Sequence, residues 1–485
     1  MTLSEQIQRP TLSGRSPVQA ATTYEKVKSK LPLPVKLYFL SIALPLEFNA
    51  GTVLLTGVRT ILLVLFLPML IKLLLGRYGK IIWTDLLFFL FCPWVIYTLH
   101  LNTPDEAVSF GGSVGIEFYG GYLLGRAYIR TPEAFAGMCK ALFWVITLTL
   151  PFAIYETQTG HAPIPEFLNK IPGFFSLVDF YNEAAGMRMG LERAQVIFEH
   201  PIHYGLFCST AFALAYTGFK GQTSTFMRYL LALIISMGVF FSVSSGAMLP
   251  MILQFILIFW AWALDKVSSR WIILMVLTAL AYIVVDAISN RTPIQVFLSY
   301  ATFSPHNAYW RVLIFEWGMK NVWMHPLYGL GLNDWVREWF MHGSSVDNFW
   351  LLNTMRYGIP GFFLIALGFA LPIWNIAWHP IAEGTRIWLF RRAWMITWVG
   401  LVLTLCTVDV WAAILSYVSF LFGSGIWFLS VDEARPQTTA EARRTLQQER
   451  TTPDRAADAA ADHEAGAKTA TPSRYTRFEQ SQTRK

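Results

Sequence analysis

The sequence is poor in charged residues and lacks the common metal-binding patterns. Only 14% of its 485 residues are charged, whereas a soluble globular chain has roughly 25%. The four cysteines, Cys92, Cys139, Cys208 and Cys406, lie in or beside apolar stretches without metal-ligand spacing, so we expect them to be packing residues. There is no HExxH or DxD pattern, and we predict neither a metal site nor a cofactor. These shortages exclude an ordinary soluble fold.

The sequence is rich in long apolar runs. "VLLTGVRTILLVLFLPMLIKLLL" and "WIILMVLTALAYIVVDAI" approach or exceed the roughly 20 residues that span a bilayer. Breaks at charged or Pro/Gly-rich positions predict an all-α polytopic membrane protein with about twelve transmembrane helices. Their approximate extents are 35–49, 53–75, 81–100, 107–128, 137–155, 196–217, 226–243, 247–264, 271–288, 349–378, 390–408 and 411–430. The glycine-rich fourth span suggests a close-packed or broken helix. No cleavable signal peptide is evident, and the first apolar run is interpreted as a retained anchor.

The orientation follows from the distribution of lysine and arginine, which favours the cytoplasmic side. With the N-terminus inside, the basic clusters of six internal loops and tails all fall on that side: Lys26/Lys28/Lys30/Lys36, Arg77/Lys80, Arg126/Arg130, Lys220/Arg228, Lys266/Arg270 and Arg386/Arg391/Arg392. The loops "EFNAG", "HLNTPDE", "SVSSG" and "TVDV" then face outward. Both termini should be cytoplasmic.

Four regions follow from these patterns. Residues 1–34 form a basic cytoplasmic tail, residues 35–430 the membrane domain, and residues 431–485 a polar tail that we expect to be disordered. A large outward loop at 289–348, between the ninth and tenth spans, should contain short amphipathic helices. A second outward loop covers about 156–195, and long loops on a rigid scaffold are where function concentrates.

The large loop contains "SPHNAYWRVLIFEWGMKNVWMHPLYGLGLNDWVREWF". Apolar spacing predicts a helix from Tyr309 to Trp323, ended by Pro326, Gly329 and Gly331, with a second short helix after it. The tryptophans around it fit an interfacial belt or platforms for sugar rings, and Trp310, Trp335 and Trp339 are the glycan-binding candidates.

Arg311 stands among bulky apolar residues on the outward side. It is either a snorkelling or ion-paired arginine, or a planar fork of donors for phosphate or diphosphate. The other outward loop adds Arg188 and Arg193 at the start of the sixth span. Glu199, His200 and His203 follow as further candidates for proton transfer, although a histidine there could instead bind backbone at the helix start.

At the mouth of the tenth span, "HGSSVDNFWLLNTMRYGIPG" places Asp347 and Asn348 directly before Phe349. Asp347 fits two interpretations, a helix cap or an acid that acts at the membrane surface. Four more acids, Asp85, Glu117, Asp286 and Asp409, fall in or near spans and should face protein or water. Glu117 is the deepest, and it fits a proton or cation site as well as an ion pair with Arg126 or Arg59.

Taken in order, these motifs resemble the O-antigen polymerase and ligase superfamily. The arginine before "FEHPIHYG", the "SVSSGA" turn, "YWRVLIFEWGMKNVWMHPLYGLGL" and "VDNFWLLNTMRYGIPG" carry the resemblance over roughly 190–365. It implies a metal-independent integral-membrane glycosyltransferase that acts on undecaprenyl-diphosphate-linked glycans at the periplasmic face of the bacterial inner membrane.

The resemblance also implies roles for individual residues. Arg193 and Arg311 match the arginines thought to engage the lipid diphosphate, with Arg188 as a third candidate. Ligases carry a histidine-asparagine pair where this chain has Asp347 and Asn348, so the resemblance favours a polymerase. His342 is then an alternative base. An arginine common in the family after the serine of the "SVSSGA" turn is replaced by Ser245.

The expected function is therefore a polymerase of exopolysaccharide or O-antigen repeat units in cell-envelope biosynthesis. A flippase and a chain-length regulator would be possible partners, and no nucleic acid is expected. A ligase that transfers glycan to lipid A core would use the same machinery. A polysaccharide-related transporter is the alternative from another class, although no internal repeat is detected.

Overall fold

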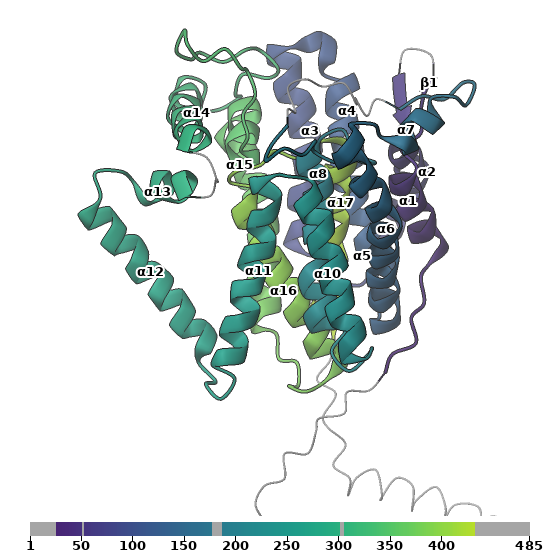
Figure 1. Ribbon diagram of the computed structural model, residues 1–485. Coiled ribbons are helices and arrows are strands. Elements are labelled where there is room, and N and C mark those ends of the chain that lie inside the picture. Colours follow the sequence, from purple (N-terminus) through teal and green to yellow (C-terminus); the bar gives the residue numbers. More distant parts are fainter. Residues whose placement is uncertain (1–25, 51–52, 177–186, 301–304, 432–485) are drawn as a thin grey trace, which may run out of the picture. The chain divides into compact units, whose positions relative to one another are not determined.

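The computed structural model describes residues 26–50, 53–176, 187–300 and 305–431 (Figure 1). The expected N-terminal tail up to residue 25 and the expected disordered tail from residue 432 lie outside these described residues. The described residues belong to the compact unit that ends at Val431.

The described chain is mostly helical, as expected for a polytopic membrane protein. Eight helical segments are long and apolar enough to cross a membrane. They are α2 (Gly57–Leu74), α3 (Trp83–Asn102), α6 (Pro132–Thr159), α11 (Ser245–Ala263), α12 (Arg270–Ile288), α15 (Phe349–Trp378), α16 (Arg386–Thr404) and α17 (Ala412–Gly423) continued by a 3₁₀ turn to Ser430. The expected count of twelve spans is therefore not confirmed.

The other four predicted spans coincide with shorter or interrupted helices. The first is α1 (Leu33–Ala43), and the seventh is α10 (Thr225–Phe241). The fourth is α4 (Ser109–Gly115) and α5 (Gly121–Tyr128), joined by a π-helical turn. The sixth is α8 (Pro201–Ser209) and α9 (Ala211–Ala213), also followed by a π-helical turn. The fourth predicted span is helical without a break from Ser109 to Tyr128, since its junction residues Gly115 and Gly121 keep right-handed helical angles, and its glycine contacts support the close-packed alternative.

A short β-hairpin corrects the strictly all-α prediction. Strands β1 (Glu47–Ala50) and β2 (Val53–Thr56) pair antiparallel where the first and second spans were predicted to end and begin. Helix α1 ends before Leu44, because the residue before a proline, here Pro45, is disfavoured in helical conformation. With 11 residues, α1 is about 16 Å long, half the thickness of the hydrocarbon core.

Aromatic rings and glycines hold the interior together. Phe369 of α15 lies 5.0 Å from Phe88 of α3 and 4.7 Å from Phe422 of α17, measured between ring centroids. Helices α5 and α17 approach closely because a Cβ at Gly121 or Gly125 would lie within 2.4 Å of a carbonyl oxygen of α17. Such small-residue contacts are typical of helix pairs in membranes.

Two of the predicted membrane acids are paired. The Arg59 Nε donates to Glu117 at 2.6 Å, which confirms the ion-pair alternative for that acid. Asp85 accepts from the Tyr122 hydroxyl at 2.5 Å and lies 3.5 Å from Arg126. These contacts satisfy charges that would otherwise be costly in lipid.

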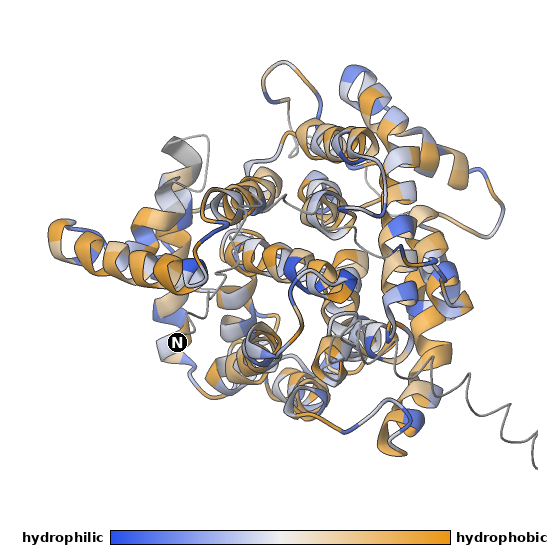
Figure 2. Cartoon of the chain, turned by 90° about the horizontal axis from the view of Figure 1, so that it is seen from below, coloured by the Kyte–Doolittle hydropathy of each residue, from blue (hydrophilic) through white to orange (hydrophobic). Residues whose placement is uncertain are grey.

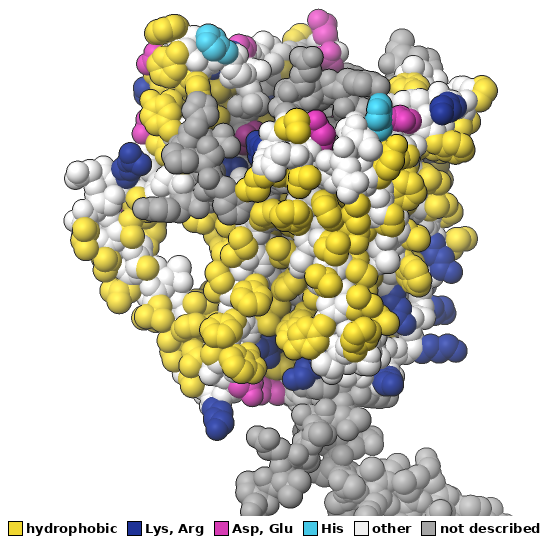
Figure 3. All heavy atoms as spheres, in the orientation of Figure 1, with side chains coloured by type: hydrophobic (Ala, Val, Ile, Leu, Met, Phe, Trp, Pro, Cys, Tyr) yellow, Lys and Arg dark blue, Asp and Glu magenta, His cyan; other side chains and the backbone are white. Residues whose placement is uncertain are grey.

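The outer surface suits a bilayer. The ribbons of the outer helices carry mostly hydrophobic residues (Figure 2), many large hydrophobic side chains are exposed, and α12 has no residue buried across its apolar window. A band of hydrophobic side chains covers the face seen in Figure 3, and lysines and arginines gather toward the end opposite α14 (Pro305–Met324). We call the end with α14 the loop end.

Helix α15 is kinked where the sequence reads "RYGIPG". Gly358 has a φ of +73°, and Pro360 follows it. The interrupted helix leaves backbone groups that the large loop uses: Met355 and Arg356 carbonyls accept from the amides of Leu330 (2.7 Å) and Gly331 (3.0 Å). The kink therefore fastens the large loop to the transmembrane bundle.

Candidate functional site

Helix α14 brings Arg311 onto the start of α15. The contact depends on Gly318, because a Cβ there would lie 2.7 Å from the Leu351 side chain and 3.1 Å from the Met355 sulfur. Helix α14 matches the helix predicted from Tyr309 to Trp323, extended by a few residues at its start. Arg311 thus lies where the large loop meets the membrane domain.

Arg311, Asp347 and Asn348 line one pocket. Its other lining residues are Ile314, Phe315, Leu351 and Cys406. We call this the arginine pocket. The Asn348 side chain accepts from the Leu351 amide at 3.0 Å and so caps α15. The capping interpretation of the sequence therefore applies to Asn348, while Asp347 presents its carboxylate to the pocket.

Three arginines act on the Asp347 carboxylate. The side chain reaches solvent at the pocket mouth, but protein atoms crowd its other sides. This burial raises the pKa of Asp347 from its ordinary value, and the positive charges of Arg311, Arg193 and Arg188 oppose the rise. Cations from both long loops are therefore close enough to Asp347 to act on its charge.

Arg193 lies on a segment that Glu156 of α6 holds in place. The two Glu156 carboxylate oxygens accept from the backbone amides of Gln195 at 2.9 Å and Val196 at 3.0 Å. Arg193 is buried, and burial together with the charge of Arg188 lowers its pKa to about 10, so it is cationic at neutral pH. Glu156 was not singled out from the sequence, because its partners are about 40 residues away.

The "SVSSGA" turn lies beside Arg311. A Cβ at Gly246 would lie at an ordinary contact distance of 3.9 Å from the Arg311 Nη2, but only 2.6 Å from the Val408 side chain. Glycine at 246 thus allows the turn to pack closely against Val408.

Unusual backbone conformations gather around these residues. Among the described residues, positive φ occurs at four non-glycine positions: Met189, Val196, Val243 and Ala412. The first two flank the Arg193 segment, the third precedes the "SSGA" residues, and the fourth begins α17. Such strain costs roughly 1–3 kcal/mol each and is typical of functional sites.

His200 and His203 make backbone contacts at the start of α8. The His200 Nδ1 accepts from the Ile202 amide at 3.1 Å, and His203 Nε2 lies 3.3 Å from the Asp409 carbonyl oxygen. Burial and the charges of Arg193 and Arg188 lower the pKa of His200 to about 4, so it is neutral at neutral pH. The described residues contain no cluster of three or more potential metal-binding side chains.

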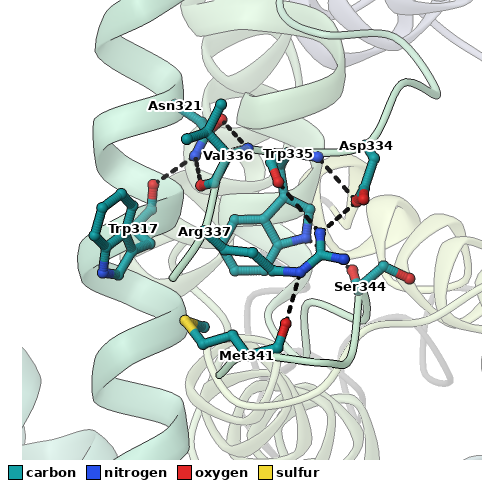
Figure 4. Close-up of polar contacts among 8 residues, drawn as sticks. All are labelled: Trp317, Asn321, Asp334, Trp335, Val336, Arg337, Met341 and Ser344. Atoms are coloured by element: carbon teal, nitrogen blue, oxygen red, sulfur yellow. Dashed lines mark hydrogen bonds and ion pairs between the residues drawn. The ribbon is translucent and has the colours of Figure 1, made fainter. Parts of the chain in front are cut away.

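The large loop has a small core of its own (Figure 4). The buried Asn321 side chain accepts from the Val336 amide at 2.9 Å and donates to its carbonyl oxygen at 2.7 Å. Arg337 Nε donates to the Met341 carbonyl at 2.8 Å. Residues 325–348 form turns and extended segments, so the prediction of a second short helix after Gly331 was wrong. The Asn321 and Arg337 side chains form hydrogen bonds with backbone groups that a helix would need for its own hydrogen bonds.

The tryptophan and histidine candidates of this loop differ in position. Trp335 is buried in the loop core and donates its indole N–H to the Ser344 carbonyl at 2.9 Å. Trp339 is 85% exposed, and Trp310 is half-buried with its ring 6.3 Å from that of Phe340. His342 is exposed and does not line the arginine pocket.

Two neighbouring residues were not recognised as parts of this region from the sequence. Trp411 donates its indole N–H to Glu199 at 2.6 Å. Asp409 lies between α16 and α17, where burial raises its pKa to about 7 against the opposing charge of Arg356. The "TVDVW" stretch carried only a weak signal, a charged and an aromatic residue in a short outward loop.

Comparison with known proteins places these residues in a family. A family model described as O-antigen ligase matches residues 230–366, which include the "SVSSGA" turn, Arg311, Asp347 and the kink of α15. No curated protein matches the chain. Residues 230–366 thus resemble the O-antigen polymerase and ligase superfamily, and the eight candidate membrane spans among the described residues indicate a membrane protein.

Proposed function

We propose that this protein is a polymerase that joins undecaprenyl-diphosphate-linked repeat units into exopolysaccharide or O-antigen at the periplasmic face of the inner membrane. The observation that carries the proposal is the arginine pocket, where Arg311 faces Asp347 at the loop end. The lysines and arginines near the opposite end support a periplasmic loop end with both termini in the cytoplasm.

The residues suit transfer from a lipid diphosphate. The acceptor hydroxyl oxygen attacks C1 of the donor sugar, the bond from C1 to the diphosphate oxygen breaks, and undecaprenyl diphosphate leaves. Arg311 and Arg193, with Arg188 at the rim, stabilise the charge that develops on the leaving group. Asp347 takes the proton of the acceptor hydroxyl. The chemistry needs no nucleotide, because the diphosphate already activates the sugar.

The exposed Trp339 fits a platform for the glycan outside the membrane, with Trp310 behind it. We assign Trp335 to holding the loop together, because its indole is buried and bonded to the loop backbone. Asn348 holds Asp347 at the mouth of α15 by capping that helix. His342 is the less suitable base, since it lies in an exposed stretch outside the arginine pocket.

A ligase would use the same groups with lipid A core as its acceptor. Aspartate in place of the ligases' histidine favours the polymerase. The two functions differ in the intermediate that a deletion strain accumulates. Single lipid-linked units indicate a polymerase, and finished polymer on the lipid carrier indicates a ligase.

The test replaces Arg311 by alanine in cells that make the polymer. We expect chain extension to stop while the protein remains in the membrane, and Arg311→Lys to recover little, because lysine lacks the planar fork of donors. Lys320→Ala is the matched control, since Lys320 is an exposed cation on the same helix. Normal polymer length in Arg311→Ala would refute the assignment.

A further inference from the structure

A second pocket lies at the loop end, beside the arginine pocket. Its lining comes from the end of α1, from the β1–β2 hairpin, from the segment before α8 and from the start of α17 (Figure 1). The side chains that matter for its chemistry are Glu47, Glu199, His203 and Trp411. The sequence did not reveal this pocket, because three stretches far apart in the chain form it, within residues 41–58, 197–203 and 411–414.

Arg311 lines the arginine pocket, whereas the charged residues that line the second pocket are acidic. Glu47 and Glu199 both line it, and neither lysine nor arginine is among its lining residues, all of which the structure describes. Two carboxylates disfavour a diphosphate but accept hydrogen bonds from hydroxyl groups. Most of the other lining residues are apolar, among them Ile42, Val58 and Ile414. The pocket therefore suits an uncharged group that combines hydroxyls with an apolar face.

Glu199 and Trp411 are fixed in a defined arrangement. The Trp411 indole N–H donates to one Glu199 oxygen at 2.6 Å, which leaves the second oxygen for another donor. The His203 ring lies 4.0 Å from the Trp411 ring in an edge arrangement, and Trp411 is 40% exposed. A carboxylate next to a partly exposed indole can bind the hydroxyls and the C–H face of one sugar.

One short segment separates the two pockets. Within residues 405–412, Cys406 lines the arginine pocket, Val408 packs against Gly246, and Trp411 lines the second pocket. The Phe349 amide, at the start of α15, donates to the carbonyls of Leu405 and Val408 at 3.0 and 3.2 Å and holds this segment in place. One short segment thus contributes lining residues to both pockets.

We propose that the second pocket binds the terminal sugar of the acceptor glycan, with Glu199 accepting hydrogen bonds from its hydroxyls and Trp411 packing against its ring. This inference rests on the proposed function, because it supplies the second of the two glycans that a polymerase joins. Glu199 and Trp411 position the acceptor, while Asp347 and the arginines act on the reacting atoms. We call this pocket the acceptor pocket.

Photo-crosslinking in cells that make the polymer tests the proposal with the natural glycan as the probe. p-Benzoylphenylalanine replaces Ala413 in the acceptor pocket and, in a separate variant, Ile314 in the arginine pocket. Ser41→p-benzoylphenylalanine is a second position in the acceptor pocket, in case substitution at 413 impairs folding. The readout is the amount of glycan attached to the membrane-inserted protein after irradiation.

We expect glycan-bearing adducts from both pockets. Adding Glu199→Gln should reduce the acceptor-pocket adduct about tenfold or more, as expected for loss of a hydrogen bond to a charged group, and leave the Ile314 adduct unchanged. Trp411→Phe keeps a ring but removes the N–H, so it should lose less adduct than Trp411→Ala. Glu106→Gln is the matched control, since Glu106 is an exposed outward-loop acid that accepts from the Ser109 hydroxyl and lines neither pocket.

The outcomes separate this inference from the proposed function. Glycan on the Ile314 variant alone would overturn the acceptor pocket but leave the proposed function standing. Acceptor-pocket adducts that are insensitive to Glu199→Gln would likewise overturn it. Glycan on neither pocket, in variants that insert normally, would overturn the proposed function itself.

Discussion

Replacing Glu156 by glutamine tests how the Arg193 segment is held. Each of the two carboxylate oxygens accepts one backbone amide, from Gln195 at 2.9 Å and from Val196 at 3.0 Å, and Glu156 is only 4% exposed. Glutamine keeps one acceptor but directs an NH₂ group at the other amide. The loss of one charge-assisted hydrogen bond costs about 1.5–3 kcal/mol.

That cost competes with backbone strain in the same segment. Val196 has a φ of 53°, an unfavourable conformation for a β-branched residue that costs roughly 1–3 kcal/mol. Since the two magnitudes are similar, we expect Glu156→Gln to let Val196 relax and Arg193 to move. A displacement of about 1 Å at a reacting centre can reduce the rate about 100-fold.

Two measurements check this prediction. Hydrogen exchange on the purified protein should show faster exchange of the Gln195 and Val196 amides, and cells should show much shorter polymer at an unchanged protein level. Glu106→Gln again serves as the control, because Glu106 is exposed, accepts from the Ser109 hydroxyl and is not among the charges that act on Glu156. Wild-type exchange rates for these two amides in Glu156→Gln, together with polymer of normal length, would refute the reasoning about Glu156.

Three further predictions concern the loop and a nearby acid. Asn321→Leu should release the Val336 segment and lower the free energy of unfolding by about 2–4 kcal/mol, because the buried Val336 amide and carbonyl groups lose their partners. Faster limited proteolysis of the large loop would show this release. Gly318→Val should displace α14 from Leu351, because its side chain would overlap that residue, and polymer formation should stop. Gly343→Val, in an exposed stretch, should leave polymer formation intact. The raised pKa of Asp409, about 7, means that the folded state holds this proton more tightly than the unfolded state. Stability contributed by this proton is therefore lost as pH rises from about 4 to 7, and Asp409→Asn should melt higher than wild type at pH 8 with little difference at pH 4.

The sequence was most informative where the evidence is local. The period of apolar residues predicted α14 closely, and the glycine-rich "GGSVGIEFYGGYLLG" predicted a closely packed helix. Arg311 attracted attention as a lone cation among apolar residues, which is costly near lipid, and the structure places it in one pocket with Asp347.

The rest depended on contacts between distant segments. Hydropathy extended the first span to residue 49, but a proline and strand pairing turn the chain into the hairpin after α1. Asp347 and Asn348 are equally good caps by type, and only the backbone geometry assigns the cap to Asn348. The acceptor pocket combines residues about 150 and 210 positions apart, so no local pattern could reveal Glu199 and Trp411 as neighbours.

The fastening of the large loop to α15 has a consequence for how such proteins can diversify. The Gly331 amide donates to the Arg356 carbonyl, and the Asn348 side chain accepts from the Leu351 amide. Residues 332–347 therefore leave and rejoin α15 at points about 7.5 Å apart along the helix axis. A 16-residue excursion with such close ends is an Ω-loop, a unit whose interior can change without moving its ends. Exchange of this unit between relatives is expected to transfer glycan preference while the membrane domain stays intact.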